Sequence, residues 1–457
     1  MLERTLLQVQ EMVHGNGLDE KWKNVRIKGV SIDSRSIQQG NLYIPIQGER
    51  FDGHSFVANA VANGAVATFW KKDVPSPPTN IPVIFVEDTL EALQALAYEY
   101  RSQLRIRVIG ITGSNGKTST KDILTSILAT TYKVQKTEGN LNNHIGLPLT
   151  ILRLEEDTEM AVIEMGMSNF GEIEFLSKLA RPNAAIITNI GESHLMDLGS
   201  REGIAIAKTE IVQGLQPDGL FVYNGDEPLL GERVPQLEIK AKIATFGDNS
   251  TNDYFPTRIV TKENGTEFSI NQASDLSFFI PALGKHNVYN SLACIAIASF
   301  FGVTWESMKE GLARLQMTRM RSEIIHTADG LTIINDAYNA SPTSMKAALA
   351  IMKDLHGYDK KIVVLGNMLE LGDQEEQFHH EVGTCIDPQV VDYVFTYGEL
   401  GKHIAQGANE HFAKERVMSF TDKEELASAL RKVVSPQDVV LLKASRGMKL
   451  EELIPLL

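Results

Sequence analysis

The residues best suited to chemistry are glycines, hydroxyls and one lysine that follow one another in Gly110-Ile-Thr-Gly-Ser-Asn-Gly-Lys-Thr-Ser-Thr120. Glycines let the backbone approach a phosphate closely, and a helix that starts here would direct unpaired N–H groups at it. Lys117 would reach the β- and γ-phosphates of a nucleotide, and the Thr118 hydroxyl would reach Mg²⁺. The usual glycine six residues before the lysine is replaced by Ile111. The loop is therefore either a variant or a chance match.

Three further polar residues follow in the same region. Glu164 ends the apolar run that starts at Met160, and His194 follows the next such run. In open α/β sheets ligands bind at the carboxyl ends of strands, so both residues are candidate metal ligands. A solvated glutamate and a capped histidine are the alternatives. Lys208 lies among small apolar residues of a predicted helix at 201–215, where the sequence alone favours a lysine on the helix surface.

The elements around the loop agree with phosphate binding. An apolar run at 105–109 predicts a buried strand, and apolar residues at helical spacing in 121–128 predict a helix. Strand, glycine-rich loop and helix, in this order, form the context that a phosphate-binding loop requires.

At 457 residues the chain is too long for one hydrophobic core, and its patterns predict three α/β domains. Residues 1–103 predict a small α/β module, in which Asp33-Ser-Arg35 is either a capped turn or a ligand site. Residues 104–317 predict a mostly parallel sheet like that of P-loop ATPases. Residues 318–457 alternate strands and helices and predict a Rossmann-like, doubly wound sheet.

Composition restricts the partners. The net charge is −14, whereas a protein that binds a nucleic acid duplex usually has a basic surface. The N-terminus lacks the apolar region of a signal peptide, and no apolar run is long enough to span a membrane. We therefore expect a cytoplasmic protein without nucleic acid or membrane partners. Cys294 and Cys385 lie far apart in apolar segments and are expected to be reduced and buried.

Together these motifs resemble those of the Mur ligases, the ATP-dependent amide-forming enzymes of peptidoglycan precursor synthesis. The loop Thr112-Gly-Ser-Asn-Gly-Lys-Thr118 is similar to that family's form, which accounts for the displaced glycine. Glu164, His194 and Ala207-Lys-Thr-Glu210 stand in the family's order. The segment Asn335-Asp-Ala-Tyr-Asn-Ala-Ser-Pro-Thr-Ser-Met345 looks like the signature of the member that adds D-alanyl-D-alanine. Asn335 and Ser341 depart slightly from the family pattern, at positions away from the expected catalytic groups.

The resemblance implies that ATP drives the joining of UDP-N-acetylmuramoyl-tripeptide to D-alanyl-D-alanine through an acyl phosphate. It implies two Mg²⁺ ions and a Lys208 that CO₂ converts to N6-carboxylysine. We expect a monomer whose domains close over the substrates. Two alternatives remain open: a related Mur or folylpolyglutamate-type ligase that adds a single amino acid, and a nucleotide switch, although no Asn-Lys-x-Asp guanine motif is present.

The same resemblance implies roles for individual residues. The catalytic groups would be Lys117, Lys208, His194 and Arg321, with Arg319 as the rival of Arg321. The metal ligands would be Thr118, Glu164, His194 and carbamylated Lys208. ATP would contact Gly113, Ser114, Asn115, Gly116, Lys117, Thr118, Ser119, Asn287, Asp336 and Asn339. The other substrates would contact Ser34, Arg35 and Asn143.

Overall fold

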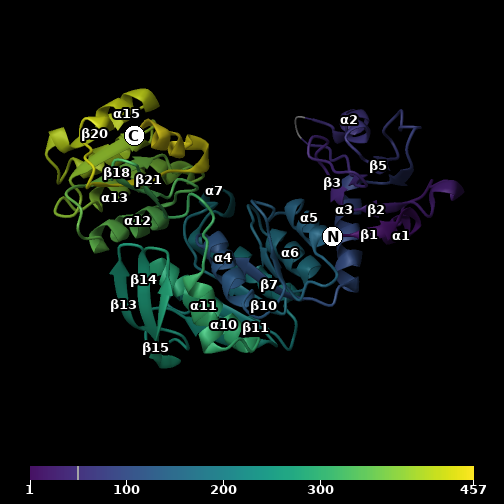
Figure 1. Ribbon diagram of the computed structural model, residues 1–457, viewed down its shortest axis with the longest axis horizontal. Helices are drawn as coiled ribbons and strands as arrows, with labels where there is room; N and C mark the ends of the chain where they lie inside the picture. Colours follow the sequence, from purple (N-terminus) through teal and green to yellow (C-terminus); the bar gives the residue numbers. More distant parts are fainter. Residues whose placement is uncertain (49–50) are drawn as a thin grey trace.

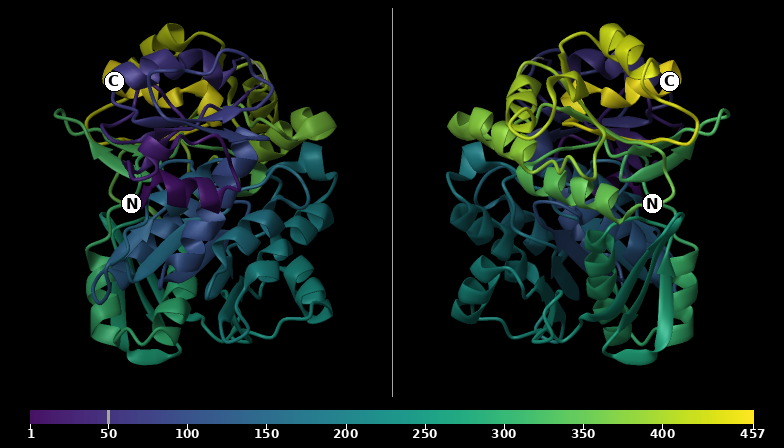
Figure 2. Two further views of the ribbon diagram at one scale, coloured as in Figure 1. Left: turned by 90° about the vertical axis from the view of Figure 1, so that its right-hand side faces the viewer. Right: turned by 90° about the vertical axis from the view of Figure 1, so that its left-hand side faces the viewer.

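The computed structural model describes residues 1–48 and 51–457 and has three α/β units in chain order (Figure 1). The first and third units lie at opposite ends of the central one, and the third unit contacts the central unit along a seam (Figures 1 and 2). The mixed α/β architecture with parallel sheets confirms the predicted fold class. No helix in the described part of the chain is long and apolar enough to cross a membrane.

The first unit has a four-stranded parallel sheet and a separate antiparallel pair of strands. The sheet order is β3-β4-β5-β6, and β1 pairs with β2. Its elements are β1 (Glu3–Thr5), α1 (Leu6–Met12), β2 (Arg26–Lys28), β3 (Val30–Ser31), β4 (Leu42–Tyr43), α2 (Val57–Ala62), β5 (Ala67–Lys71), β6 (Val83–Val86) and α3 (Thr89–Gln103).

The central unit has a six-stranded parallel sheet in the order β12-β11-β10-β7-β9-β8, and an antiparallel sheet of β13, β14 and β15. Its strands are β7 (Arg107–Thr112), β8 (Val134–Lys136), β9 (Met160–Glu164), β10 (Ala184–Ile187), β11 (Leu220–Asn224), β12 (Lys242–Phe246), β13 (Pro256–Lys262), β14 (Gly265–Ile270) and β15 (Ala273–Ile280). Its helices are α4 (Lys117–Leu128), α5 (Gly146–Arg153), α6 (Glu172–Ala180), α7 (Leu195–Leu198), α8 (Arg201–Thr209), α9 (Pro228–Arg233), α10 (Lys285–Phe300) and α11 (Trp305–Ala313).

The third unit has a six-stranded sheet in the order β16-β17-β21-β18-β19-β20. The pairs are parallel as predicted, except that the edge strand β16 is antiparallel to β17 and was not predicted. Its elements are β16 (Glu323–His326), β17 (Thr332–Asn335), α12 (Pro342–Asp354), β18 (Lys361–Gly366), α13 (Glu375–Thr384), β19 (Tyr393–Tyr397), α14 (Gly401–Ala408), β20 (Val417–Phe420), α15 (Lys423–Arg431) and β21 (Val439–Lys443).

The hydrophobic cores show how the three units are held together. One core joins the first unit to one face of the central sheet, with Leu96 and Tyr100 of α3 in the same cluster as Leu149 of α5. The other face of that sheet packs on α4, α10 and the antiparallel sheet. The two faces of the third sheet have cores of their own. The first unit is therefore joined to the central unit by apolar packing. The third unit meets it through the polar contacts described below and through Leu283 of the central unit, which is part of a core of the third unit.

Several predicted boundaries differ from the structure. The strand before the loop is β7, two residues later than predicted, and α4 begins at Lys117 rather than at residue 121. The reason is Gly116, whose left-handed backbone lets the helix start directly after the loop. The helix expected at 201–215 continues beyond Thr209 only as a 3₁₀ turn. Both cysteines are free, but only Cys294 is buried, and the expectation that Cys385 is buried was wrong.

Candidate active site

The loop between β7 and α4 requires glycine at two of its positions. Gly113 has a φ of 148°, and a Cβ there would lie 1.8 Å from the Thr188 hydroxyl. Gly116 has a φ of 82° and precedes the first residue of α4. The first-turn N–H groups of α4 and the positive end of its dipole therefore begin at Lys117, as phosphate binding requires.

Lys117 folds back over the loop. Its Nζ donates hydrogen bonds to the carbonyl oxygens of Gly113, at 2.6 Å, and Ser114, at 3.3 Å. Burial lowers the pKa of Lys117, although the carboxylate of Glu164 acts in the opposite direction. The amine thus lies at the loop where a nucleotide phosphate would be held.

Thr118 and Glu164 meet beside the loop, as predicted. The Thr118 hydroxyl donates to Glu164 Oε2 at 3.0 Å, and Asn142 Nδ2 donates to the other carboxylate oxygen at 2.9 Å. Lys121 lies 3.7 Å from Glu164 Oε2. Glu164 is buried, so the interpretation as a solvated residue at a strand end was wrong. Nothing in the sequence distinguished Asn142 from Asn143, which instead accepts the N–H groups that begin α5.

Arg321 comes from the third unit and reaches the loop. Its guanidinium donates to the Thr118 hydroxyl at 3.3 Å and lies 4.0 Å from the centre of the Tyr338 ring, a cation–π distance. Its rival Arg319 is exposed at the surface. The structure therefore brings Arg321, and not Arg319, to the loop, and it adds Tyr338, which the sequence did not single out as the partner of this arginine.

His194 precedes the short helix α7 and has a left-handed backbone, with a φ of 63°. Burial lowers its pKa to about 4, and the charge of Lys117 contributes in the same direction. The imidazole is consequently neutral near pH 7, which is the form that binds metals.

Lys208 is buried rather than on the helix surface, so the interpretation from the sequence alone was wrong. Its side chain is among the largest that are fully buried, with 1% of the residue exposed. Burial lowers the pKa of Lys208 well below its ordinary value, and Lys117 contributes in the same direction. No carboxylate in the described parts of the chain forms an ion pair with it. The amine is therefore held without a compensating charge.

The start of α12 also contacts the loop. Ser341 Oγ donates to Asn115 Oδ1 at 3.3 Å, and Thr343 Oγ1 donates to Glu192 at 2.8 Å. Ser114 Oγ accepts the Gly191 N–H at 2.9 Å. These bonds fix the loop against both the central sheet and the third unit.

The residues predicted to bind adenosine lie on both sides of the seam. Asp336 accepts a hydrogen bond from Lys443 at 2.5 Å, and Lys443 also donates to the Asn339 carbonyl at 3.0 Å. Asn287, in the first turn of α10, donates to the Leu283 carbonyl, whereas its buried Oδ1 accepts no hydrogen bond from the residues that the structure describes. Ser119 is buried in the first turn of α4. The contacts of these residues with a nucleotide stay predictions.

The two residues predicted from the first unit are not brought to this site. Arg35 pairs with Asp33 at 2.9 Å, and the Ser34 hydroxyl accepts a hydrogen bond from Asn59. This is the capped turn that the sequence allowed as an alternative. Whether the turn also binds a ligand stays untested.

A cleft of about 320 Å³ joins the central groups. It is lined by Lys117, Asn142, Asn143, His144, Glu164, Gly166, Met167, Ser168, Glu172, His194, Arg321, Tyr338 and Asn339. No cluster of three or more His, Cys, Asp or Glu suited to a metal occurs among the described residues. Mg²⁺ at nucleotide sites needs only one or two carboxylates beside the phosphates, so the adjacent Thr118 hydroxyl and Glu164 carboxylate fit it.

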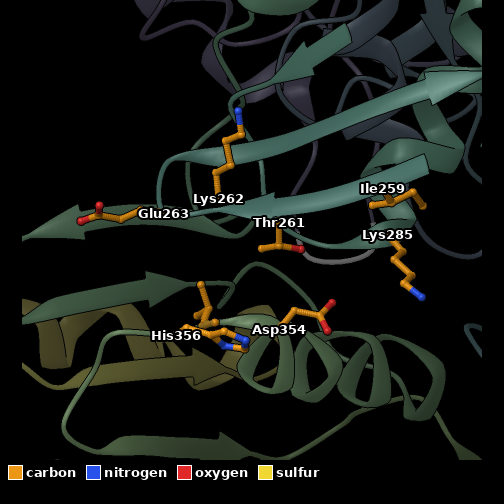
Figure 3. Close-up of a pocket in the computed structure, with 8 residues that line it drawn as sticks. Ile259, Thr261, Lys262, Glu263, Lys285, Asp354 and His356 are labelled. Atoms are coloured by element: carbon orange, nitrogen blue, oxygen red, sulfur yellow. The ribbon is translucent and has the colours of Figure 1, made fainter. Parts of the chain in front are cut away.

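A second cleft, of about 350 Å³, marks the far part of the seam (Figure 3). It lies between β13 and the end of α12 and shares no lining residue with the first cleft. Lys285 of the central unit and Asp354 of the third reach toward the gap, whereas Lys262 points away from it (Figure 3). The two units are therefore bonded at the loop and separated by a gap here.

Comparisons with known proteins agree with this geometry. Three Mur ligase models match the chain: the catalytic domain at 26–101, the middle domain at 111–298 and the glutamate ligase domain at 320–446. The UDP-N-acetylmuramoyl-tripeptide–D-alanyl-D-alanine ligase of Bacillus subtilis is 54% identical over 454 residues, covering 99% of this chain and 98% of that protein.

Solved structures give the same result. A crystal structure of MurF from Acinetobacter baumannii has a TM-score of 0.90 and 32% identity, covering 100% of this chain and 98% of that one. The MurF ligase of Thermotoga maritima in complex with ADP has a TM-score of 0.82 and 30% identity, covering 94% of this chain and 96% of that one. Since the models, the relatives and the folds all cover nearly the full length, the chain belongs to the Mur ligase family.

Proposed function

We propose that this chain is an ATP-dependent ligase that joins D-alanyl-D-alanine to UDP-N-acetylmuramoyl-tripeptide, giving the UDP-linked pentapeptide, ADP and phosphate. The observation that carries this function is the 54% identity, over 99% of the chain, to a ligase of that name. The segment 335–345 supports the same choice within the family, because it forms the third unit's side of the site through Tyr338 and Ser341.

The reaction must first convert a carboxylate into a group that an amine can attack. The terminal carboxylate of the tripeptide attacks the γ-phosphate of ATP, ADP leaves, and an acyl phosphate forms. The amine of the dipeptide then attacks the acyl carbon, and phosphate leaves. Two anions approach each other in the first step, so cationic groups are needed between them. Lys117 and Arg321 supply such charge from the central and third units.

Thr118 and Glu164 would hold one Mg²⁺ beside the loop, and neutral His194 would help to hold a second. Bound Mg²⁺ would reduce the repulsion between the phosphates and the incoming carboxylate. Glu164 is oriented for this role by Asn142 and by the Thr118 hydroxyl. Closure of the domains over this partly buried cleft would also keep water from the acyl phosphate.

Lys208 would serve as a ligand of the second metal after reaction with CO₂. Carbamylation requires an unprotonated amine, and burial favours that form because it lowers the pKa of Lys208. The product is an anionic carbamate, formed as the amine nitrogen bonds to the CO₂ carbon and loses a proton. The modification therefore replaces a buried potential cation by a buried anion near His194 and the Mg²⁺ site, where an anion has a partner.

The remaining units would bind the other substrates. We assign the uridine diphosphate part to the first unit, with Ser34, Arg35 and Asn143 as candidate contacts, and D-alanyl-D-alanine to the third. We keep domain limits near residues 103 and 317, which fall between α3 and β7 and between α11 and β16. One chain contains all of these groups, so we propose an active monomer. ATP is a cytoplasmic metabolite, and its use supports a cytoplasmic location for the proposed reaction.

The first test is phosphate release from ATP in the presence of UDP-N-acetylmuramoyl-tripeptide and candidate acceptors. We expect release that depends on D-alanyl-D-alanine and does not occur with single amino acids. Release only with a single amino acid would instead identify another ligase of the family. Stable binding of GTP in preference to ATP, without turnover, would favour a nucleotide switch.

The second test concerns Lys208. We expect Lys208→Met to lower kcat more than about 100-fold, because the carbamate cannot form. Methionine is unbranched and of similar length, so it fills the buried space without the amine. Removing CO₂ from the buffer should lower wild-type activity, and bicarbonate should restore it. Lys178→Met on the exposed side of α6 is the control. Full activity of the Lys208 variant would refute the role.

The third test separates the two arginines. Arg321→Ala should lower kcat about 100- to 1000-fold, because a cation facing the reacting phosphate is lost. Binding of the UDP substrate, measured by calorimetry, should be unchanged. Arg319→Ala removes the same charge two residues away at an exposed position and should leave kcat as in the wild type. Equal loss in both variants would show that the local charge matters and not the Arg321 contact.

A further inference from the structure

A carboxylate of the third unit faces His194, and the reaction described above does not use it. Glu370 Oε2 lies 3.3 Å from His194 Nδ1 across the seam. Glu370 follows β18 in residues 367–371, which we call the Glu370 loop. The His194 side chain is one quarter exposed, at 26%, and lines the cleft beside Lys117 and Glu164. Glu370 therefore approaches one ring nitrogen of His194, while the other, Nε2, remains available.

The Glu370 loop is held rigidly within the third unit. The buried His379 accepts the Met368 N–H on Nε2 at 2.8 Å and donates its Nδ1–H to the Glu375 carbonyl at 2.6 Å. The Leu369 N–H donates to Ser445 Oγ at 3.0 Å. Two successive N–H groups of the loop are thus fixed from two different elements. The Glu370 backbone cannot readily shift without breaking these bonds.

Both members of the contact have unusual backbone conformations. His194 has a φ of 63° and Glu370 a φ of 66°, in the left-handed region that residues other than glycine rarely adopt. Such strain persists where the surrounding structure determines it, often at functional sites. The neighbouring Gly372 lies close to α7, because a Cβ added at Gly372 would be 3.6 Å from Met196 Cα. The segment Gly372–Gln374, which directly follows the Glu370 loop, therefore contacts α7.

A second contact fixes the same part of the central unit. Glu192, two residues before His194, accepts hydrogen bonds from the Thr343 N–H and hydroxyl at the start of α12. The segment around His194 is consequently held by the third unit from two sides. Its conformation depends on how the two units dock.

We propose that Glu370 is a positioning residue for His194, by which docking of the third unit orients the imidazole for metal binding. A carboxylate oxygen 3.3 Å from Nδ1 favours the tautomer with its hydrogen on Nδ1, which leaves the lone pair on Nε2, the nitrogen that remains for a ligand. This arrangement of carboxylate, histidine and metal recurs where a second group must set the tautomer of a ligand histidine. The inference rests on the metal role proposed above for His194.

The experiment uses the full-length protein with two readouts. The first is ¹⁵N NMR of histidine-labelled protein without metal, in which His194→Asn assigns the His194 signals among the 11 histidines. We expect the Nδ1–H tautomer in the wild type and a shift toward Nε2–H, the tautomer that a free histidine side chain favours in water, in Glu370→Ala. The second readout is Mn²⁺ binding with ADP, measured by electron paramagnetic resonance, where Glu370→Ala should weaken affinity about 10- to 100-fold.

Asp373→Ala is the matched control, because it removes one exposed carboxylate three residues away. It should change neither readout. An unchanged tautomer or an unchanged Mn²⁺ affinity in Glu370→Ala would overturn the proposal. A raised KM for D-alanyl-D-alanine with normal Mn²⁺ binding would also overturn it and would make Glu370 a substrate contact. His194→Asn distinguishes failure of the metal role of His194 from failure of the positioning role of Glu370. If this variant leaves Mn²⁺ affinity intact, His194 is not a metal ligand, and the proposal for Glu370 fails with it.

Discussion

The Thr118 hydroxyl joins the central and third units at the phosphate loop. It donates to Glu164 at the end of β9 and accepts from Arg321 of the third unit. Neither unit alone contains this set, so the central sheet and the sheet of the third unit must be arranged so that the loop, β9 and the 320–340 segment converge. The first unit is joined to the central unit by an apolar core, whereas the seam with the third unit combines these polar contacts with the apolar contact of Leu283. A polar seam can separate at lower cost in free energy than an apolar core.

The seam also explains why charge is concentrated there. Lys117 and Arg321 bring positive groups into a partly buried cleft whose carboxylate, Glu164, is already bonded, and Lys208 is buried nearby. In the absence of phosphates such an arrangement is unfavourable, and burial lowers the pKa of both lysines. Bound phosphates would compensate this charge, which couples substrate binding to completion of the site. Lys208 is the extreme case, because it is fully buried and no carboxylate among the described residues forms an ion pair with it.

Motif spacing and apolar periodicity predicted the strands, helices and loop that position the site residues better than the contacts between these elements. The phosphate loop, the glutamate at the end of β9 and the alternating strands of the third unit follow from spacing and apolar periodicity. The early start of α4 did not, because it depends on the left-handed backbone of Gly116. The burial of Lys208 is a property of packing between helices and sheet, and only the family resemblance indicated it. Asn142 and Glu370 became visible only when distant segments were brought together.

The central claim is that the tripeptide carboxylate is activated before the dipeptide arrives, at a site completed by Arg321. Positional isotope exchange tests it most directly. ATP labelled with ¹⁸O in the β–γ bridge is incubated with enzyme and UDP-N-acetylmuramoyl-tripeptide, without D-alanyl-D-alanine. Reversible formation of the acyl phosphate predicts that the label moves from the bridge to non-bridging positions, and only when the tripeptide is present. Absence of exchange, or exchange without the tripeptide, would contradict the account.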